Sequence, residues 1–284
     1  MGRLHKKPPK KPLFRAESTK GEGKKETGRN TRLNCALPCD KIEKNKRETN
    51  AKMKIHGLQK MTLLDYPGRV ACTVFLGGCD FRCPFCHNAE LLDAGAPAVM
   101  EDAELLAFLE KRRGLLDGVA ITGGEPLLRS GLYELLSAIR ALGYPVKLDT
   151  NGNHPAKLKE LVAAGLVDYV AMDVKNSPAR YAETVGLASF DMTGVRESIE
   201  FLLEGTVDYE FRTTVVRELH DESSLEEIGK LIRGAKRYFL QSFTDRDTVL
   251  FAGLHAPEKE ALLRYAEIVR PYVKSVEVRG VSAG

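Results

Sequence analysis

Residues 71–88, ACTVFLGGCDFRCPFCHN, are the most informative stretch of this 284-residue chain. The first six residues, 71–76, are apolar and partly β-branched, a pattern that predicts a buried β-strand. Two glycines follow, and then three cysteines stand at the spacing C-x3-C-x2-C: Cys79, Cys83 and Cys86. A single short loop after a strand can therefore bring three thiols onto one small object.

Outside this stretch, short apolar runs alternate with helix-like stretches about six times. The predicted strands are 71–76, 119–121, 146–148, 169–172, 209–216, 238–240 and 276–278. The predicted helices are 103–113, 132–142, 155–164, 193–204, 224–232 and 257–269. This alternation predicts an α/β fold with a parallel sheet and right-handed crossovers. Because six units are too few for a closed eight-unit barrel, we expect an open, partial (βα)6-type barrel.

Three further unusual segments also follow predicted strands. They are 122–126 (TGGEP), 148–152 (LDTNG) and 172–175 (MDVK). In parallel α/β folds the chemistry gathers at the carboxyl ends of the strands. We therefore expect these segments and the cysteines to lie at one edge of the sheet.

The three thiols suit two kinds of metal site. Three thiolates are one ligand short of the four that a [4Fe–4S] cube uses, so one iron would stay open to a bound molecule. The alternative is a structural zinc site in which His87 is the fourth ligand. Adjacent residues 86 and 87 would have difficulty reaching one tetrahedral ion, and three thiols cannot pair off as disulfides. The spacing favours the open iron–sulfur cluster.

With these residues the sequence resembles the radical S-adenosylmethionine (SAM) enzymes. The resemblance rests on the cysteine spacing, with Phe85 before the last cysteine, and on the segment 122–126. It implies a radical SAM core whose [4Fe–4S] cluster is held by Cys79, Cys83 and Cys86. It also implies that the amino group of SAM is held by Gly123, Gly124 and Glu125. Glycines allow close backbone approach, and a carboxylate can accept hydrogen bonds from an ammonium.

A narrower resemblance covers roughly residues 53–284 and concerns the activating enzymes of glycyl-radical enzymes. Segments 149–152 and 173–175 are similar to two motifs of those enzymes. Segment 57–68 is similar to the start of anaerobic ribonucleoside-triphosphate reductase activating proteins.

The same resemblance implies roles for single side chains. Asp149 contacts the SAM ribose or, together with Asp173, a monovalent cation, while Lys175 neutralises the SAM carboxylate. Arg212, on the predicted strand 209–216, would be costly to bury unpaired. We expect it to reach either the SAM carboxylate or a structural partner. The histidines form no ligand-like group, and we assign no role to His56, His154, His220 or His255.

The function implied by the resemblance is reductive cleavage of SAM at the cluster, followed by formation of a glycyl radical on a partner enzyme. No side chain is expected to be the catalytic group, because the 5′-deoxyadenosyl radical comes from the cofactor. The implied partners are an anaerobic ribonucleotide reductase and an electron donor such as flavodoxin or ferredoxin. The first alternative is a radical SAM enzyme acting on a small heterocycle, as deazapurine synthases do. The second is a zinc-containing nucleic-acid-binding module.

Composition divides the chain at residue 53. Residues 1–52 carry 16 Lys and Arg against 6 Asp and Glu, a net charge of +10, whereas residues 53–284 carry −6. The basic part has little apolar patterning, so we expect an extension without a packed core, in which Cys35 and Cys39 have no role. A nucleic-acid-binding arm is the alternative, although we expect no nucleic-acid partner. Apolar runs are too short for a membrane span, and the expected location is the cytoplasm.

Overall fold

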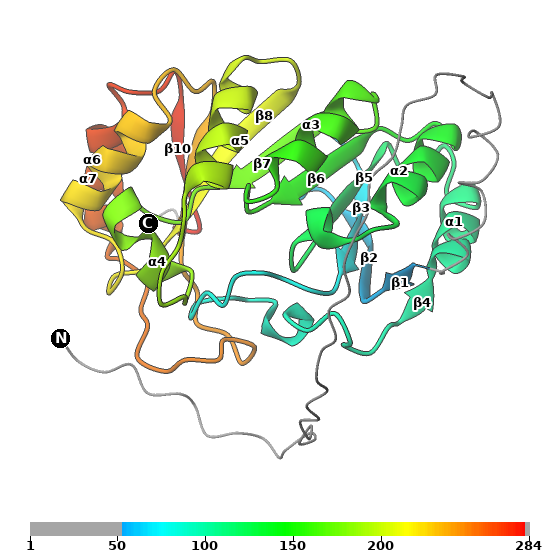
Figure 1. Cartoon of the computed structure of the whole chain (residues 1–284), viewed down its shortest axis with the longest axis horizontal. Coiled ribbons are helices and arrows are strands. Elements are labelled where there is room, and N and C mark those ends of the chain that lie inside the picture. The colour runs from blue at the N-terminus through cyan, green and yellow to red at the C-terminus, as the bar shows by residue number, and fades with distance from the viewer. Residues whose placement is uncertain (1–52, 282–284) are drawn as a thin grey trace, which may run out of the picture. The chain divides into compact units, whose positions relative to one another are not determined.

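The computed structural model describes residues 53–281, so the extension 1–52, with Cys35 and Cys39, lies outside the described residues. An eight-stranded sheet with the order β10-β9-β8-β7-β6-β5-β3-β2 forms the centre (Figure 1). Its strands are β2 (Gly57–Thr62), β3 (Ala71–Leu76), β5 (Gly118–Gly123), β6 (Val146–Thr150), β7 (Tyr169–Asp173), β8 (Asp208–Val215), β9 (Tyr238–Ser242) and β10 (Val276–Arg279). All neighbouring pairs are parallel except β2 with β3.

Six helical crossovers connect the parallel strands, as the sequence predicts. The main helices are α1 (Asp102–Glu110), α2 (Leu132–Ala141), α3 (Pro155–Ala163), α5 (Thr193–Leu203), α6 (Glu222–Leu231) and α7 (Lys259–Val269), and a short α4 (Tyr181–Thr184) precedes α5. Figure 1 shows them around the outside of the curved sheet. Within residues 53–281, no helix is both long enough and apolar enough to cross a membrane.

The sheet is an open barrel rather than a closed one. Its edge strands, β10 and β2, each have one hydrogen-bonded neighbour within the described residues. The predicted fold class, an open α/β barrel with a parallel sheet, is therefore confirmed. The prediction missed β2 and the small antiparallel pair β1 (Lys54–Ile55) with β4 (Met100–Glu101). These strands lack the continuous apolar run of a central strand, because only a few of their side chains are buried.

Local sequence signals set the helix boundaries. Asp221 precedes α6, and its carboxylate accepts a hydrogen bond from the Ser224 N–H at 2.8 Å, while the Ser224 hydroxyl accepts one from the Asp221 N–H at 2.9 Å. Gly143, Gly165 and Gly205 follow α2, α3 and α5 with positive φ angles, as expected of glycines that end helices.

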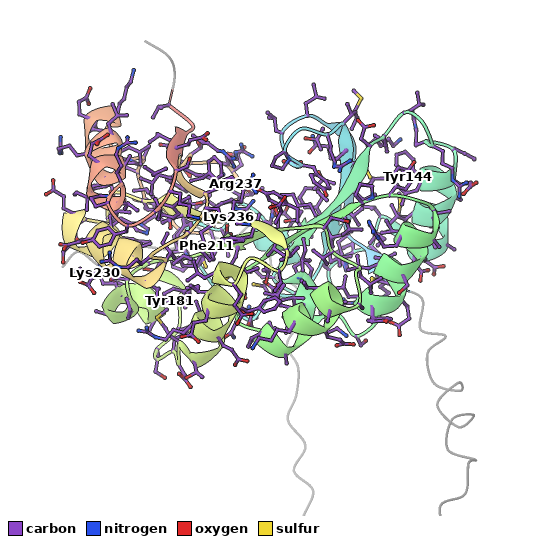
Figure 2. The ribbon with its side chains drawn as sticks, turned by 90° about the horizontal axis from the view of Figure 1, so that it is seen from above. Tyr144, Tyr181, Phe211, Lys230, Lys236 and Arg237 are labelled. Atoms are coloured by element: carbon purple, nitrogen blue, oxygen red, sulfur yellow. The ribbon has the colours of Figure 1, made fainter. Side chains whose placement is uncertain are left out.

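Strand alternation gives the sheet two unlike faces. The helix-covered face carries the main core, which runs along the whole sheet. Figure 2 shows two of its aromatic side chains, Tyr144 near α1 and Tyr181 toward the other end. The concave face carries polar side chains instead, such as Lys147 and Asp149 on β6 and Arg212 on β8, which line two cavities. The inside of the open barrel is therefore available for ligand binding.

Candidate active site

A cavity of about 250 Å³ lies at the carboxyl ends of the parallel strands. The loop after β3 contributes three thiols to its wall, those of Cys79, Cys83 and Cys86. The Phe81 N–H lies 3.4 Å from the Cys79 sulfur and donates to it. The thiols therefore face one space from one loop, as a cluster with three protein ligands requires.

Burial keeps these thiols in their protonated form when no metal is bound. It raises the pKa of Cys79 to about 11 and that of Cys83 to about 12, and it also raises the pKa of Cys86. A thiol binds metal as its thiolate, so loading the site with iron must release these protons. The donor set and its shared cavity fit a [4Fe–4S] cluster.

The geometry disfavours the zinc alternative. The His87 ring stacks on Phe243 with centroids 5.7 Å apart, and its Nε2 lies 2.8 Å from the Thr244 carbonyl oxygen. Within residues 53–281, no three His, Cys, Asp or Glu side chains surround a position for a single metal ion. A cube, by contrast, takes each thiolate at a different iron and needs its ligands farther apart.

The glycine pair at the end of β5 is required by the backbone at the end of β3 and in the cysteine loop. A Cβ on Gly123 would lie 2.1 Å from the Leu76 carbonyl oxygen, and one on Gly124 would lie 2.2 Å from the Gly78 carbonyl oxygen. The Gly124 N–H donates to the Leu76 carbonyl at 2.8 Å, which joins the two segments. The sequence suggested close approach to a ligand, whereas the closest approach in the structure is between two protein segments. Both glycines also line the cavity.

Glu125 lies behind the cavity wall rather than in it. Its side chain is fully buried, and its Oε1 accepts hydrogen bonds from the Leu127 N–H at 3.0 Å and the Thr150 hydroxyl at 2.9 Å. Its Oε2 accepts from the Asn151 N–H at 2.6 Å. Burial raises the pKa of this carboxyl to about 7, although these hydrogen bonds oppose the shift. Glu125 therefore ties the end of β5 to the end of β6.

Asp80, inside the cysteine loop, makes the second connection to the end of β6. Its carboxylate accepts hydrogen bonds from Asn151 at 2.8 Å and Asn153 at 2.7 Å, and it lies 3.0 Å from His154 Nε2. Burial opposes the charge, but these hydrogen bonds lower the pKa of Asp80 to about 2. The hydrogen bond to Asp80 raises the pKa of His154 above its usual range.

Charged side chains from β6, β7 and β8 form a chain across the concave face. Arg212 donates from Nε to Asp173 Oδ1 at 2.9 Å, and its Nη1 lies 3.3 Å from Asp149 Oδ2. Lys147 bonds the other oxygen of Asp149, and Lys175 Nζ lies 2.8 Å from Asp173 Oδ2. Burial disfavours both carboxylate charges, but Arg212 and the lysines hold the pKa of each aspartate below its usual range. Of the two expectations for Arg212, the structure shows the structural partners.

A second cavity, of about 580 Å³, lies beside the first. Its wall includes the loop 63–67 after β2 and, on the opposite side, Arg279 and Gly280 at the end of β10. It therefore lies between the two edges of the open sheet. The two cavities share the residues Asp149, Arg212 and Gln241.

Eight of the nine predicted site residues line the first cavity, and Glu125 is the exception. Their contacts with a cluster or with SAM remain predictions. Sequence reasoning missed two residues that hold the cysteine loop. His56 Nδ1 accepts from the Gly77 N–H at 2.9 Å, and Asn88 donates to the Gly123 carbonyl at 3.2 Å. Asn88 stands two residues after the last cysteine and could have been noticed, whereas His56 is isolated in the sequence.

Comparison with known proteins finds a family model and several related proteins that match this chain. Residues 73–232 match a family model described as the radical SAM superfamily. The chain is 30% identical over 239 residues to a protein of Methanocaldococcus jannaschii provisionally named a glycyl-radical enzyme activating enzyme, and the match covers 81% of this chain and 98% of that protein. It is 41% identical over 98 residues to the 7-carboxy-7-deazaguanine synthase of Hyperthermus butylicus, which covers 34% of this chain and 40% of that enzyme.

Among solved structures, the chain is similar to Streptococcus suis SuiB bound to S-adenosylmethionine. The TM-score is 0.57 at 14% identity, and the match covers 73% of this chain and 52% of that chain. At this identity the likeness concerns the fold alone, and it agrees with the open α/β barrel described above.

Proposed function

The chain belongs to the radical SAM superfamily, and from this premise we propose that it forms a glycyl radical on a partner enzyme. The relative that it matches along 98% of its length is provisionally named for this activity. The specific partner that we propose is an anaerobic ribonucleoside-triphosphate reductase, on the basis of segment 57–68. Membership in the superfamily implies a [4Fe–4S] cluster and SAM as cofactors, and we propose flavodoxin or ferredoxin as the electron donor and the cytoplasm as the location.

In this proposal, different residues of the first cavity bind the cluster and SAM. We assign the cluster to Cys79, Cys83 and Cys86, and the SAM carboxylate to Lys175, whose ammonium lies in the wall of the same cavity. A bound and reduced cluster would supply one electron for the cleavage of SAM, and the hydrogen atom would come from a glycine Cα of the partner enzyme. The walls of the first cavity would orient SAM for this step.

The carrying observation is the second cavity, which shares three wall residues with the first and lies between the two edges of the sheet. A segment of a macromolecule could enter there and bring a backbone atom to within roughly 3–3.5 Å of the SAM 5′ carbon. Two leucines of the loop 63–67 stand at this cavity and are largely exposed, Leu63 by 68% and Leu64 by 88%. Adjacent exposed leucines are typical of protein contact surfaces.

Electron paramagnetic resonance of the mixed proteins tests the proposal. With reductant and SAM, we expect a doublet that needs both proteins, SAM and the candidate glycine of the reductase. Changing that glycine to alanine should remove the signal. SAM turnover without any partner radical would contradict the proposal.

A paired variant tests the route of entry. Leu63→Ser with Leu64→Ser should lower the yield of the partner radical without changing SAM affinity. Leu115→Ser, a leucine that is 63% exposed outside both cavities, is the matched control and should leave the yield unchanged. Equal radical yields from the paired variant and the wild type would exclude entry past this loop.

A second candidate function is supported by the 41% identity over 98 residues with 7-carboxy-7-deazaguanine synthase. The first cavity alone would then receive a small heterocycle. Supplying the protein with reductant, SAM and candidate small heterocycles, and analysing the mixture by mass spectrometry, separates the two functions. A modified heterocycle without a partner radical would establish the second one.

We also propose that residues 53–284 are the catalytic domain and that residues 1–52 contribute nothing to catalysis. The match to the superfamily, residues 73–232, lies within this domain. A shortened chain that begins at Met53 should assemble the cluster and cleave SAM as well as the full chain. Loss of activity on shortening would contradict this division.

A further inference from the structure

The carboxylates of Asp149 and Asp173 already accept hydrogen bonds from positively charged side chains. The two oxygens of Asp149 contact Lys147 Nζ and, at 3.3 Å, Arg212 Nη1. The two oxygens of Asp173 accept hydrogen bonds from Arg212 Nε at 2.9 Å and from Lys175 Nζ at 2.8 Å. Each of the four carboxylate oxygens therefore contacts a cationic side chain, and Arg212 serves two of them.

The sheet register places Arg212 between the two aspartates. Asp173 on β7 is the direct register partner of Arg212 on β8, while Asp149 on β6 pairs with Ala171 of β7. The guanidinium thus reaches across β7 to a carboxylate two strands away. Its side chain is 13% exposed, and its two bonds come from different nitrogens of a planar, permanently charged group.

The positive charges of this group outnumber its negative charges by one. Lys147, Lys175 and Arg212 carry three positive charges against the two negative charges of the aspartates. The neighbouring Glu210 does not alter the balance, because it accepts a hydrogen bond from Tyr169 at 2.9 Å and lies 3.4 Å from Arg279 Nη1. An added sodium or potassium ion would raise the positive excess of this group to two.

These observations do not fit the monovalent cation that the family resemblance implied at Asp149 and Asp173. Hard cations bind through oxygen atoms, and each carboxylate oxygen here is bonded to a donor. An ion bound by both aspartates would have to share the space between them with the Arg212 guanidinium, which already contacts both carboxylates. We propose that Arg212 takes the place of a monovalent cation between these aspartates, so that SAM binding by this chain needs neither sodium nor potassium. The inference rests on SAM binding and does not depend on the identity of the partner enzyme.

The wild-type protein provides the first test. The affinity of the reconstituted, unreduced enzyme for SAM is measured by calorimetry in chloride salts of potassium, sodium and choline at equal ionic strength. Choline is too large for such a site but screens charge equally. We expect the three dissociation constants to agree within about twofold, less than 0.5 kcal/mol in binding free energy. A dissociation constant at least tenfold lower in potassium or sodium would overturn the proposal.

The variant Arg212→Met provides the second test, because it leaves the facing carboxylate oxygens without a guanidinium. Its thermal unfolding midpoint should be higher in potassium or sodium than in choline, whereas the wild-type midpoint should not differ. Its SAM affinity should be lower than that of the wild type and should recover in part with potassium or sodium. A purely structural role for Arg212 would lower the midpoint equally in all three salts, and that result would contradict the proposal.

Arg140→Met is the matched control. Arg140 lies 2.6 Å from Asp168, so its removal also breaks an arginine–carboxylate pair, but it exposes one carboxylate rather than two facing ones. Its midpoint should fall equally in the three salts. Because the midpoints are measured without SAM or a partner, failure of the glycyl-radical proposal would leave these outcomes interpretable.

Discussion

The two sides of the first cavity are built from different interactions. The side formed by β3 and β5 depends on backbone contacts, in which Gly123 and Gly124 lie against the carbonyls of Leu76 and Gly78. The side formed by β6, β7 and β8 depends on a chain of charged side chains centred on Arg212. The first side has almost no tolerance for added atoms. The second depends on the pairing of opposite charges.

The largest expected effect is the removal of a thiol from the backbone-built side. Cys83→Ala should abolish both the cluster and SAM cleavage, because two remaining thiolates cannot hold the cube. Iron and acid-labile sulfide after anaerobic reconstitution measure the loss. Cys72→Ala is the control, since Cys72 is buried in β3 within the main core, and this variant should keep about four irons and four sulfides. A cluster retained by Cys83→Ala would contradict the assignment.

The next largest effect is expected from steric overlap at Gly124. Gly124→Ala places a methyl group 2.2 Å from the Gly78 carbonyl oxygen, so the cysteine loop must move. We expect the free energy of unfolding to fall by about 3 kcal/mol, and cluster loading to fall with it. Urea denaturation measures the change. Gly143→Ala, where the added carbon meets nothing within 4 Å, should cost only about 1–2 kcal/mol from its positive φ. Equal costs for the two variants would mean that the close approach is unimportant.

On the charged side, Lys175→Met should weaken SAM binding without removing the cluster. The variant reduces the local charge from one positive excess to none, and losing one charge-assisted hydrogen bond costs about 1.5–3 kcal/mol, or roughly 10–100-fold in affinity. Calorimetry with SAM measures this loss. Lys159→Met, which breaks an exposed pair with Glu197, should bind SAM as the wild type does. An unchanged affinity in Lys175→Met would exclude this lysine as the carboxylate partner.

The smallest expected effect concerns the hydrogen bond between Asp80 and His154, which connects the two sides of the first cavity. Hydrogen bonding to Asp80 raises the pKa of His154 above 6.5, so the stabilisation is complete below that pH and is lost as the pH rises through the folded pKa. At acid pH, the ionised Asp80 carboxylate stabilises the folded protein fully above pH 3.8. This stabilisation is lost as the pH falls toward the folded pKa of about 2. The free energy of unfolding of the wild type should therefore exceed that of His154→Gln most between about pH 4 and 6.5, by at most about 1 kcal/mol. Denaturation at pH 5.5 and pH 9 measures the difference, and an equal difference at both values would contradict the assignment.

The elements of the fold were predictable from the sequence because central parallel strands and their helices carry continuous local patterns. Edge elements were not predictable in the same way. The side chains of Gln59, Lys60 and Met61 on β2 are exposed, and the strand pairing shifts register there. A search for apolar runs therefore passes over β2, although this strand forms one edge of the open barrel.

The sequence alone identified the superfamily, because its motifs are local. Three cysteines within one loop and a glycine pair after the next strand identify the superfamily without coordinates. What those residues contact is another matter. The glycine pair suggested an approach to a ligand, and Glu125 suggested an ammonium partner. In the structure, Gly123 makes its closest approach to the end of β3 and Gly124 to the cysteine loop, and Glu125 holds the end of β6.

The tertiary structure alone decided how the charges are arranged. Arg212 stands 63 residues from Asp149 and 39 from Asp173, and no local pattern relates them. Their meeting depends on the order of three parallel strands and on a register that sets Asp173 beside Arg212. Hydrophobic periodicity fixes which residues form a strand, whereas the alignment of neighbouring strands arises from packing across the whole sheet. The pairing of the charged side chains therefore becomes visible only when the sheet is assembled.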